Sequence, residues 1–259
     1  MPASTATRIA EPGIDGPRIG APILVEGTYN FRSTGGYAAR RGVTRSGGLF
    51  RSDALHGLNP RGLEQFAAQG IVRVIDLRDS TELRQAPSAT GSLVETIHHP
   101  IFEGAAVPVD RPAPRLSEVY RAIATDRAAA LAGAVRLIAE APEGGVLVHC
   151  TAGKDRTGMV VATALAAVGV SRDDVLADYA ASADNLAGEW VERMIEAYSS
   201  RTTAPLDDTV RELIASSPAE ALEEALDVID DAYGGAERLL ALHGLDDDAL
   251  AGLHARLVG

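Results

Sequence analysis

The chain has 259 residues, a formal net charge of −12 and a hydrophobic content of 46%. These values suit one globular domain over residues 1–259, and the acidic charge argues against a nucleic-acid binder, whose affinity would come from a basic surface. No apolar run in the sequence reaches the roughly 20 residues that a membrane-spanning helix requires.

The first half of the chain alternates short apolar segments with helical patterns. Ile23 to Val25 and Leu49 to Arg51 are apolar stretches bounded by glycine and serine, and we predict strands there. Residues 30–37 between them read as a polar loop. The pair Asn59-Pro60 is typical of a helix start, and Gly70 is typical of its end.

The middle of the chain continues this alternation. We predict a strand over Ile71 to Ile75, a short helix over Ser80 to Gln85 and a further strand near Leu93 to His98. The segment Arg115 to Glu140 has a helical period with a break near Thr125-Asp126.

The last part of the chain is mainly helical. A buried strand over Gly145 to His149 is followed by an apolar helix over Arg156 to Val168. After Ser171 we predict several helices, separated near residues 201–205, 216–218 and 234–235. Strands alternate with helices first and helices dominate later, so we expect an α/β domain with helical additions.

The single cysteine, Cys150, excludes an intramolecular disulfide and a zinc site of several cysteines, and it fits a reducing compartment. Residues 1–20 read as a flexible lead without the apolar core of a signal peptide. We therefore expect a cytoplasmic protein, with export by a route that needs no signal peptide left open. The only lysine, Lys154, lies four residues after Cys150.

The segment from Val148 to Gly158 holds the candidate chemistry. It joins a strand to a helix, where backbone N–H groups and the helix N-terminus converge on an anion and stabilise a thiolate. Arg156 has a planar fork that suits two phosphate oxygens, and Gly153 lets the backbone turn. These features predict nucleophilic attack by Cys150 on phosphorus through a phosphocysteine intermediate. The expected phosphate-binding residues are Thr151, Ala152, Gly153, Lys154, Asp155 and Arg156.

Two other roles for this cysteine are conceivable from the sequence. A lone cysteine is most often a buried, inert residue, but the nearby arginine, lysine and glycines argue against that here. A rhodanese-like sulfur-transfer loop also begins with a cysteine after a strand, but it does not require the closing Arg156-Thr157-Gly158.

The string from His149 to Gly158 resembles the actinobacterial and mycobacterial protein tyrosine phosphatase B family. The likeness covers roughly residues 28–259 and includes Asn30-Phe31-Arg32, residues 49–53, Asp76-Leu77-Arg78 and residues 231–234. The resemblance implies a tyrosine-phosphatase-like central sheet flanked by helices. It also implies activity on phosphotyrosine, with phosphoserine, phosphothreonine and phosphoinositides as further substrates.

A leaving alkoxide or phenoxide needs a general acid within hydrogen-bond reach of the phosphate. Many cysteine phosphatases use an aspartate some thirty to forty residues before the cysteine, and Asp110 lies at that distance. The family resemblance instead implies Asp155, which we favour over Asp76 and Asp110. The alternative role for Asp76 is an ion pair with Arg78 that braces the loop.

Two further residues have supporting roles in this interpretation. We expect His149 to orient the cysteine loop, and Thr157 to hydrogen-bond the Cys150 sulfur and stabilise it as a leaving group. Lys154 is expected to project from the loop, where it could meet the extra phosphates of an inositol lipid. No metal or cofactor is expected, and the histidines outside the loop have no partners at metal-ligand spacing.

Residues 186–219 are interpreted as a helical lid. Trp190, Met194 and Tyr198 recur every four residues and form one apolar stripe on a helix. Packing of that stripe into the core is the alternative. The polar break at residues 201–205 and the family resemblance, which implies two helices over the active site, favour a mobile two-helix lid over Cys150.

Two function classes follow. The first is a phosphatase acting through Cys150, whose partners are phosphorylated proteins or phosphoinositides. The second is a regulatory module that recognises phosphorylated ligands without turnover. The intact Cys150 and Arg156 favour the enzyme.

Overall fold

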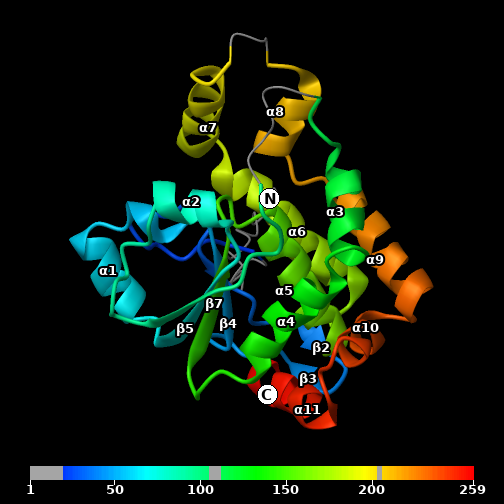
Figure 1. Cartoon of the computed structure of the whole chain (residues 1–259). Helices are drawn as coiled ribbons and strands as arrows, with labels where there is room; N and C mark the ends of the chain where they lie inside the picture. The colour runs from blue at the N-terminus through cyan, green and yellow to red at the C-terminus, as the bar shows by residue number, and fades with distance from the viewer. Residues whose placement is uncertain (1–19, 105–111, 203–205) are drawn as a thin grey trace, which may run out of the picture.

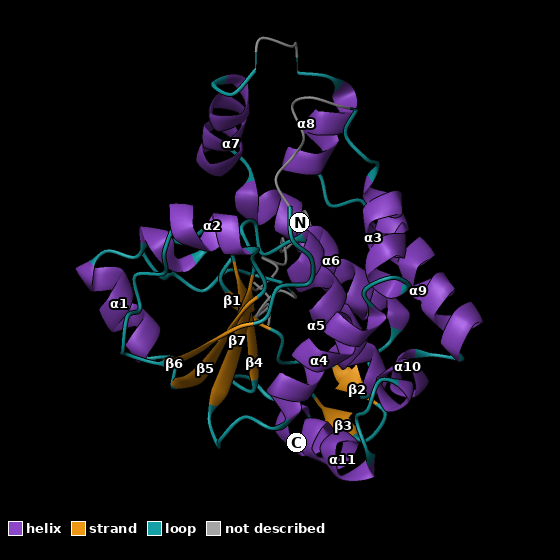
Figure 2. Ribbon diagram, in the orientation of Figure 1, coloured by secondary structure: helices purple, strands orange, loops and turns teal. Residues whose placement is uncertain are grey.

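The computed structural model describes residues 20–104, 112–202 and 206–259. Its centre is a five-stranded sheet with helices on both faces (Figures 1 and 2). The strand order is β1 (Arg32–Ser33), β4 (Leu49–Ser52), β7 (Gly145–His149), β5 (Ile71–Asp76) and β6 (Glu95–His98). The last four strands are parallel, and β1 is antiparallel to β4. The expected α/β architecture is confirmed.

The helices follow the strands in the alternating order that the sequence indicates. A 3-10 turn covers Leu55–Gly57, and the α-helices are α1 (Pro60–Ala67), α2 (Ser80–Gln85), α3 (Leu116–Ala124), α4 (Ala128–Ala139), α5 (Asp155–Ala167), α6 (Arg172–Leu186), α7 (Glu189–Ser199), α8 (Asp208–Ala215), α9 (Ala219–Tyr233), α10 (Ala236–Leu242) and α11 (Asp247–Leu257). No helix in the described part of the chain is long and apolar enough to cross a membrane.

Alternating side chains divide the core between the two faces of the sheet. In β7, Val146 and Val148 belong to the larger hydrophobic cluster, which includes residues of α3 to α6 and α9 to α11. Leu147 between them belongs to a smaller cluster on the other face, together with Phe66 of α1. Because successive strand residues point to opposite faces, a strand that is apolar throughout must be covered on both sides.

Two local expectations were wrong. Ile23 to Val25 does not form a strand: Ile23 N–H donates to Phe31, but the Val25 carbonyl accepts from Thr28, so the chain turns before a ladder can form. In addition, the segment predicted as a polar loop, residues 30–37, contains β1. A small hairpin of β2 (Ala38–Ala39) and β3 (Gly42–Val43) follows it.

The helix boundaries follow local signals. The Asn59 side chain accepts from the Gly62 N–H at the start of α1, as its position before Pro60 predicts. Thr125 ends α3, so the expected break between α3 and α4 is confirmed. The break between α6 and α7 falls close to residue 186, the predicted start of the lid. It lies at Gly188, whose φ of +84° is in the left-handed region that favours glycine.

Candidate active site

The loop that follows β7 lies at the carboxyl ends of the parallel strands and leads directly into α5. Gly153 has a φ of +64°, and a Cβ atom built there would lie 2.1 Å from the carbonyl oxygen of Ser52 at the end of β4. The loop therefore packs so closely against the neighbouring strand that glycine is required at this position.

Two buried side chains hold the carbonyl groups of this loop from behind. Asn30 donates through Nδ2 to the carbonyls of Ala152 and Gly153, at 3.0 and 3.1 Å. Arg51 donates to the carbonyl of Gly153 at 2.8 Å and to that of Lys154 at 3.5 Å. These contacts turn three successive carbonyls away from the cavity.

The backbone N–H groups of the loop are consequently free to bind an anion. The Thr151 carbonyl also faces outward, because it accepts from the N–H of Ala54 at 3.1 Å. Within the described ranges, none of the N–H groups of residues 151–154 donates a hydrogen bond to another protein group. Unpaired N–H groups that converge at a helix N-terminus form an anion-binding concavity.

A buried charge cluster supports the loop. Arg51 and Arg32 both contact Asp178 of α6, with N–O distances of 2.5 and 3.5 Å, and Tyr37 donates to the same carboxylate at 2.9 Å. Burial opposes ionisation of Asp178, but the two arginines outweigh it and lower its pKa. Two arginines against one carboxylate leave a net positive charge behind the loop that follows β7.

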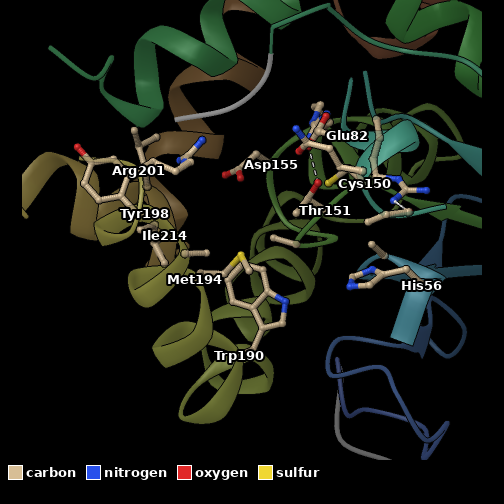
Figure 3. A pocket seen from close by; sticks show the side chains of 18 residues that line it. His56, Glu82, Cys150, Thr151, Asp155, Trp190, Met194, Tyr198, Arg201 and Ile214 are labelled. Carbon is tan, nitrogen blue, oxygen red and sulfur yellow. Dashed lines mark hydrogen bonds and ion pairs between the residues drawn. The ribbon is translucent and has the colours of Figure 1, made fainter. Parts of the chain in front are cut away.

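Cys150 lies on the wall of a cavity of about 350 Å³ beside the loop, although the residue itself is only 1% exposed. Figure 3 shows Asp155 between the Cys150 loop and the side chains of α7 and α8. The cavity is lined by Ala54, His56, Arg78, Glu82, Gln85, Ala86, Cys150, Thr151, Ala152, Asp155, Arg156, Trp190, Met194, Ala197, Tyr198, Arg201, Leu213 and Ile214.

Arg156 is fixed by Glu82 of α2. Its two terminal nitrogens donate to the two carboxylate oxygens at 2.6 and 2.8 Å, and the Thr151 hydroxyl donates to the same carboxylate. Burial opposes the charge of Arg156, but these hydrogen bonds and the negative charges of Cys150 and Glu82 outweigh it and raise the pKa of the guanidinium. Arg156 is thus held as a cation beside Cys150.

Asp155 is the first residue of α5 and lines the cavity. Its Oδ1 atom accepts a hydrogen bond of 2.5 Å from the Tyr120 hydroxyl and lies 3.6 Å from Lys154 Nζ. The side chain is 25% exposed, so it can reach a bound group. This placement suits the expected proton donor.

The other two candidate acids are less well placed. Both carboxylate oxygens of Asp76 accept from Arg78, at distances between 2.6 and 3.2 Å, and Asp76 does not line the cavity. Its geometry is that of the bracing ion pair. Asp110 lies outside the described residues.

His149 ends β7 behind the loop. Its Nδ1 lies 3.1 Å from the Cys150 carbonyl and its Nε2 lies 3.6 Å from Asp76. Burial lowers the pKa of His149, which favours a neutral imidazole. A neutral side chain at the base of the loop can orient Cys150 but supplies no charge to the cavity.

Two side chains differ from the sequence-based expectation. Lys154 is fully buried and does not line the cavity. Its Nζ donates to the carbonyls of Leu213 and Ser216 at the end of α8, at 2.8 and 2.6 Å. The Thr157 hydroxyl is buried and has no hydrogen-bond partner in the described structure, so the expected bond to the Cys150 sulfur is not formed.

The two helices α7 and α8 stand above the carboxyl ends of the strands (Figure 1). Trp190, Met194 and Tyr198 of α7 and Ile214 of α8 line the cavity that contains Cys150. The helices share a hydrophobic cluster that is separate from the two clusters on the sheet. The apolar stripe predicted from the sequence therefore faces the site.

Comparison with known proteins agrees with this geometry. A model of a tyrosine phosphatase family matches residues 23–259. The chain belongs to this tyrosine phosphatase family. It is 30% identical to the triple specificity protein phosphatase PtpB of Mycobacterium tuberculosis, over 90% of this chain and 98% of that protein.

Two other relatives match shorter parts of this chain. A Cupriavidus necator protein, assigned only provisionally as a tyrosine-protein phosphatase, is 35% identical over 58% of this chain and 59% of its own length. A tyrosine-protein phosphatase of Nostoc commune is 46% identical over 20% of this chain and 18% of its own length.

Four residues that contact the Cys150 loop had no role assigned to them from the sequence. Asn30 and Arg51 lie in segments that carried the family resemblance, but nothing local indicates that their side chains bind loop carbonyls. Glu82 matches an N-terminal capping box with Asp79, which predicts a helix start and not a contact with an arginine. Tyr120 gave no signal beyond an apolar position on a helix.

Proposed function

We propose that this protein hydrolyses phosphotyrosine in protein substrates through a phosphocysteine intermediate on Cys150. The observation that carries the proposal is the unpaired set of N–H groups of residues 151–154, which directly follow Cys150 in the loop and precede the fixed fork of Arg156. This arrangement is complementary to the oxygens of a transferring phosphoryl group, where charge develops.

The reaction has two displacement steps. In the first, the Cys150 thiolate attacks phosphorus, the S–P bond forms, and the bond from phosphorus to the tyrosyl oxygen breaks as Asp155 donates its proton to that oxygen. In the second, water attacks the phosphocysteine, the Asp155 carboxylate accepts a proton from the water, and the S–P bond breaks. Phosphate leaves and the Cys150 thiolate is restored. Arg156 and the loop N–H groups stabilise the equatorial oxygens in both steps.

The cavity walls favour an aromatic leaving group. One side is polar and carries the loop, while the opposite side presents Trp190, Met194 and Ile214. A phenyl ring attached to the bound phosphate would extend from the loop toward this apolar side, where aromatic packing is favourable.

Further substrate classes belong to the proposal. We propose phosphoserine, phosphothreonine and phosphoinositides as additional substrates of this chain. The name of the Mycobacterium tuberculosis relative states triple specificity, which supports more than one class of substrate. The contacts of Lys154 with α8 remove the reason for assigning a lipid preference to this residue.

The test is to trap the intermediate. Wild-type protein is mixed with p-nitrophenyl phosphate, quenched in acid and examined by mass spectrometry for phosphate on the peptide that contains Cys150. We expect phosphocysteine and a vanadate-sensitive burst of p-nitrophenol in the wild type. Cys150→Ser should show neither, while it still binds vanadate. Substantial turnover by Cys150→Ser would exclude Cys150 as the nucleophile.

The same experiment separates the enzyme from the alternative, a phosphate-recognising regulatory module without turnover. A module would bind phosphotyrosine peptides equally well as wild type and as Cys150→Ser, and neither form would release phosphate.

A further inference from the structure

The buried hydroxyl of Tyr120 contacts the side chain to which the proposed proton transfer is assigned. Tyr120 lies on α3 and is fully buried, and its hydroxyl donates to Asp155 Oδ1 at 2.5 Å. Asp155 lies on a different element, at the start of α5. This hydrogen bond restrains the carboxyl group from a second element, in addition to the helix that carries it.

A second tyrosine completes the arrangement. The hydroxyl of Tyr179 on α6 lies 2.6 Å from that of Tyr120, and the two rings meet edge to face with centroids 5.9 Å apart. Because Tyr120 donates its only hydroxyl proton to Asp155, Tyr179 must donate to Tyr120. The three groups therefore form a directed chain from Tyr179 through Tyr120 to Asp155.

Both tyrosines keep their protons at neutral pH. Burial and the nearby Asp155 raise the pKa of each phenol above its ordinary value. The Tyr120 hydroxyl is thus a permanent donor, and Asp155 Oδ1 is permanently occupied as an acceptor, with Lys154 Nζ also 3.6 Å away.

This arrangement decides which oxygen of Asp155 can carry a proton. Oδ1 faces a donor and a cation, so a proton there would be repelled. No hydrogen bond to Oδ2 occurs within the described parts of the chain, and the side chain is one of those that line the cavity. The transferable proton therefore resides on Oδ2.

We propose that Tyr120 is a positioning residue for the reaction: it holds the Asp155 carboxyl group so that Oδ2 presents its proton to the leaving oxygen of the substrate. This inference rests on the proposed function, and in particular on Asp155 as the general acid. Tyr179 contacts the Tyr120 hydroxyl and orients it, without a hydrogen bond of its own to Asp155 in the described structure.

The test compares two matched variants, Tyr120→Phe and Tyr179→Phe, which each remove one buried hydroxyl from the same chain. Values of kcat and KM are measured with p-nitrophenyl phosphate, whose leaving group needs little protonation, and with phenyl phosphate, whose leaving group needs a proton. Tyr120→Phe should lower kcat for phenyl phosphate about tenfold, change kcat for p-nitrophenyl phosphate less than about twofold, and leave both KM values unchanged. Tyr179→Phe should have a clearly smaller effect.

Equal losses with both substrates, or equal effects of the two variants, would show a structural role and overturn the inference. The double variant Tyr120→Phe/Asp155→Asn tests whether Tyr120 acts through Asp155, with the folded fraction of each variant checked by circular dichroism. If Tyr120 acts through Asp155, the double variant should match Asp155→Asn with phenyl phosphate, and a further loss would contradict the inference.

Failure of the proposed function would look different. If Asp155→Asn slows both substrates equally, Asp155 is not the general acid, and the Tyr120 inference fails with it. If Asp155→Asn shows the leaving-group dependence and Tyr120→Phe does not, only the role of Tyr120 is wrong.

Discussion

Replacing Glu82 with glutamine removes the charge that holds Arg156 while it keeps the size of the side chain. The Glu82 carboxylate accepts from both terminal nitrogens of Arg156, from the Thr151 hydroxyl and from the Asp79 N–H at the start of α2. Its side chain is 16% exposed and that of Arg156 is 8% exposed, so water screens the pair only weakly.

The expected losses of stability and activity follow from these contacts. Removing one partner of a buried ion pair costs about 3–5 kcal/mol, because the other charge is left without compensation. Glutamine still offers one acceptor oxygen, so we expect Glu82→Gln to lower the free energy of unfolding by about 3 kcal/mol. Arg156 then loses its fixed orientation, and kcat/KM should fall about 100-fold, which corresponds to about 2.7 kcal/mol of transition-state stabilisation.

The assay combines denaturant unfolding, kcat/KM with p-nitrophenyl phosphate, and the Kd for inorganic phosphate. Glu103→Gln is the matched control, because Glu103 accepts from the N–H and hydroxyl of Ser80 on the same helix, both contacts being exposed. The control should change the free energy of unfolding by less than about 1 kcal/mol and leave activity unchanged. Tighter phosphate binding or faster turnover by Glu82→Gln would refute the reasoning, since Glu82 would then be competing with substrate for Arg156.

Three other outcomes are expected. Burial raises the pKa of Asp53 to about 6, from 3.8 for the free side chain, so ionisation of Asp53 lowers the free energy of unfolding as the pH rises from about 4 to 6. Asp53→Asn should remove this pH dependence and raise the free energy of unfolding at pH 7 by up to about 3 kcal/mol, which denaturant titration would measure. Glu82 and Asp178 have lowered pKa values, because their arginine partners outweigh the effect of burial. The stability that these two carboxylates give the folded protein is complete above about pH 4.5 and should be lost as the pH falls further. Measuring the thermal unfolding midpoint against pH would detect this loss. Lys154→Met removes two hydrogen bonds to the end of α8, so the helices α7 and α8 should move away from the site more often. Hydrogen peroxide should then inactivate the enzyme through Cys150 about tenfold faster. An unchanged inactivation rate would contradict a mobile lid.

Much of the fold was predictable because its signals are local. Asn59 before Pro60 sets the start of α1, and the β-branched residues of β5 and the apolar run of β7 mark central strands. The short strands β1, β2 and β3 were missed because two-residue strands have no periodicity and depend on their partners. Ile23 to Val25 was predicted as a strand but is not one, because an apolar composition does not supply a partner strand.

The candidate site was predictable only where its residues are close in sequence. Cys150, Asp155 and Arg156 are brought together by one strand-loop-helix connection, and their order already indicates the chemistry. Glu82 and Tyr120 reach the loop from α2 and α3, and only tertiary packing brings them there. Lys154 shows a further limit, because the sequence does not determine on which side of a loop a side chain lies.

The charges around the loop explain how an acidic protein can hold an anion at this position. The cations are Arg32, Arg51, Lys154 and Arg156, and the acids in contact with them are Asp178, Glu82 and Asp155. These charges sum to +1. Two more arginines, Arg78 and Arg201, line the cavity, and Arg78 is paired with Asp76. Oriented dipoles add to this positive charge, namely the unpaired N–H groups of residues 151–154 and the N-terminus of α5. Asn30 and Arg51 hold the carbonyls of Ala152 and Gly153, whose peptide groups carry the N–H groups of Gly153 and Lys154, so residues behind the loop orient the dipoles that would attract an anion.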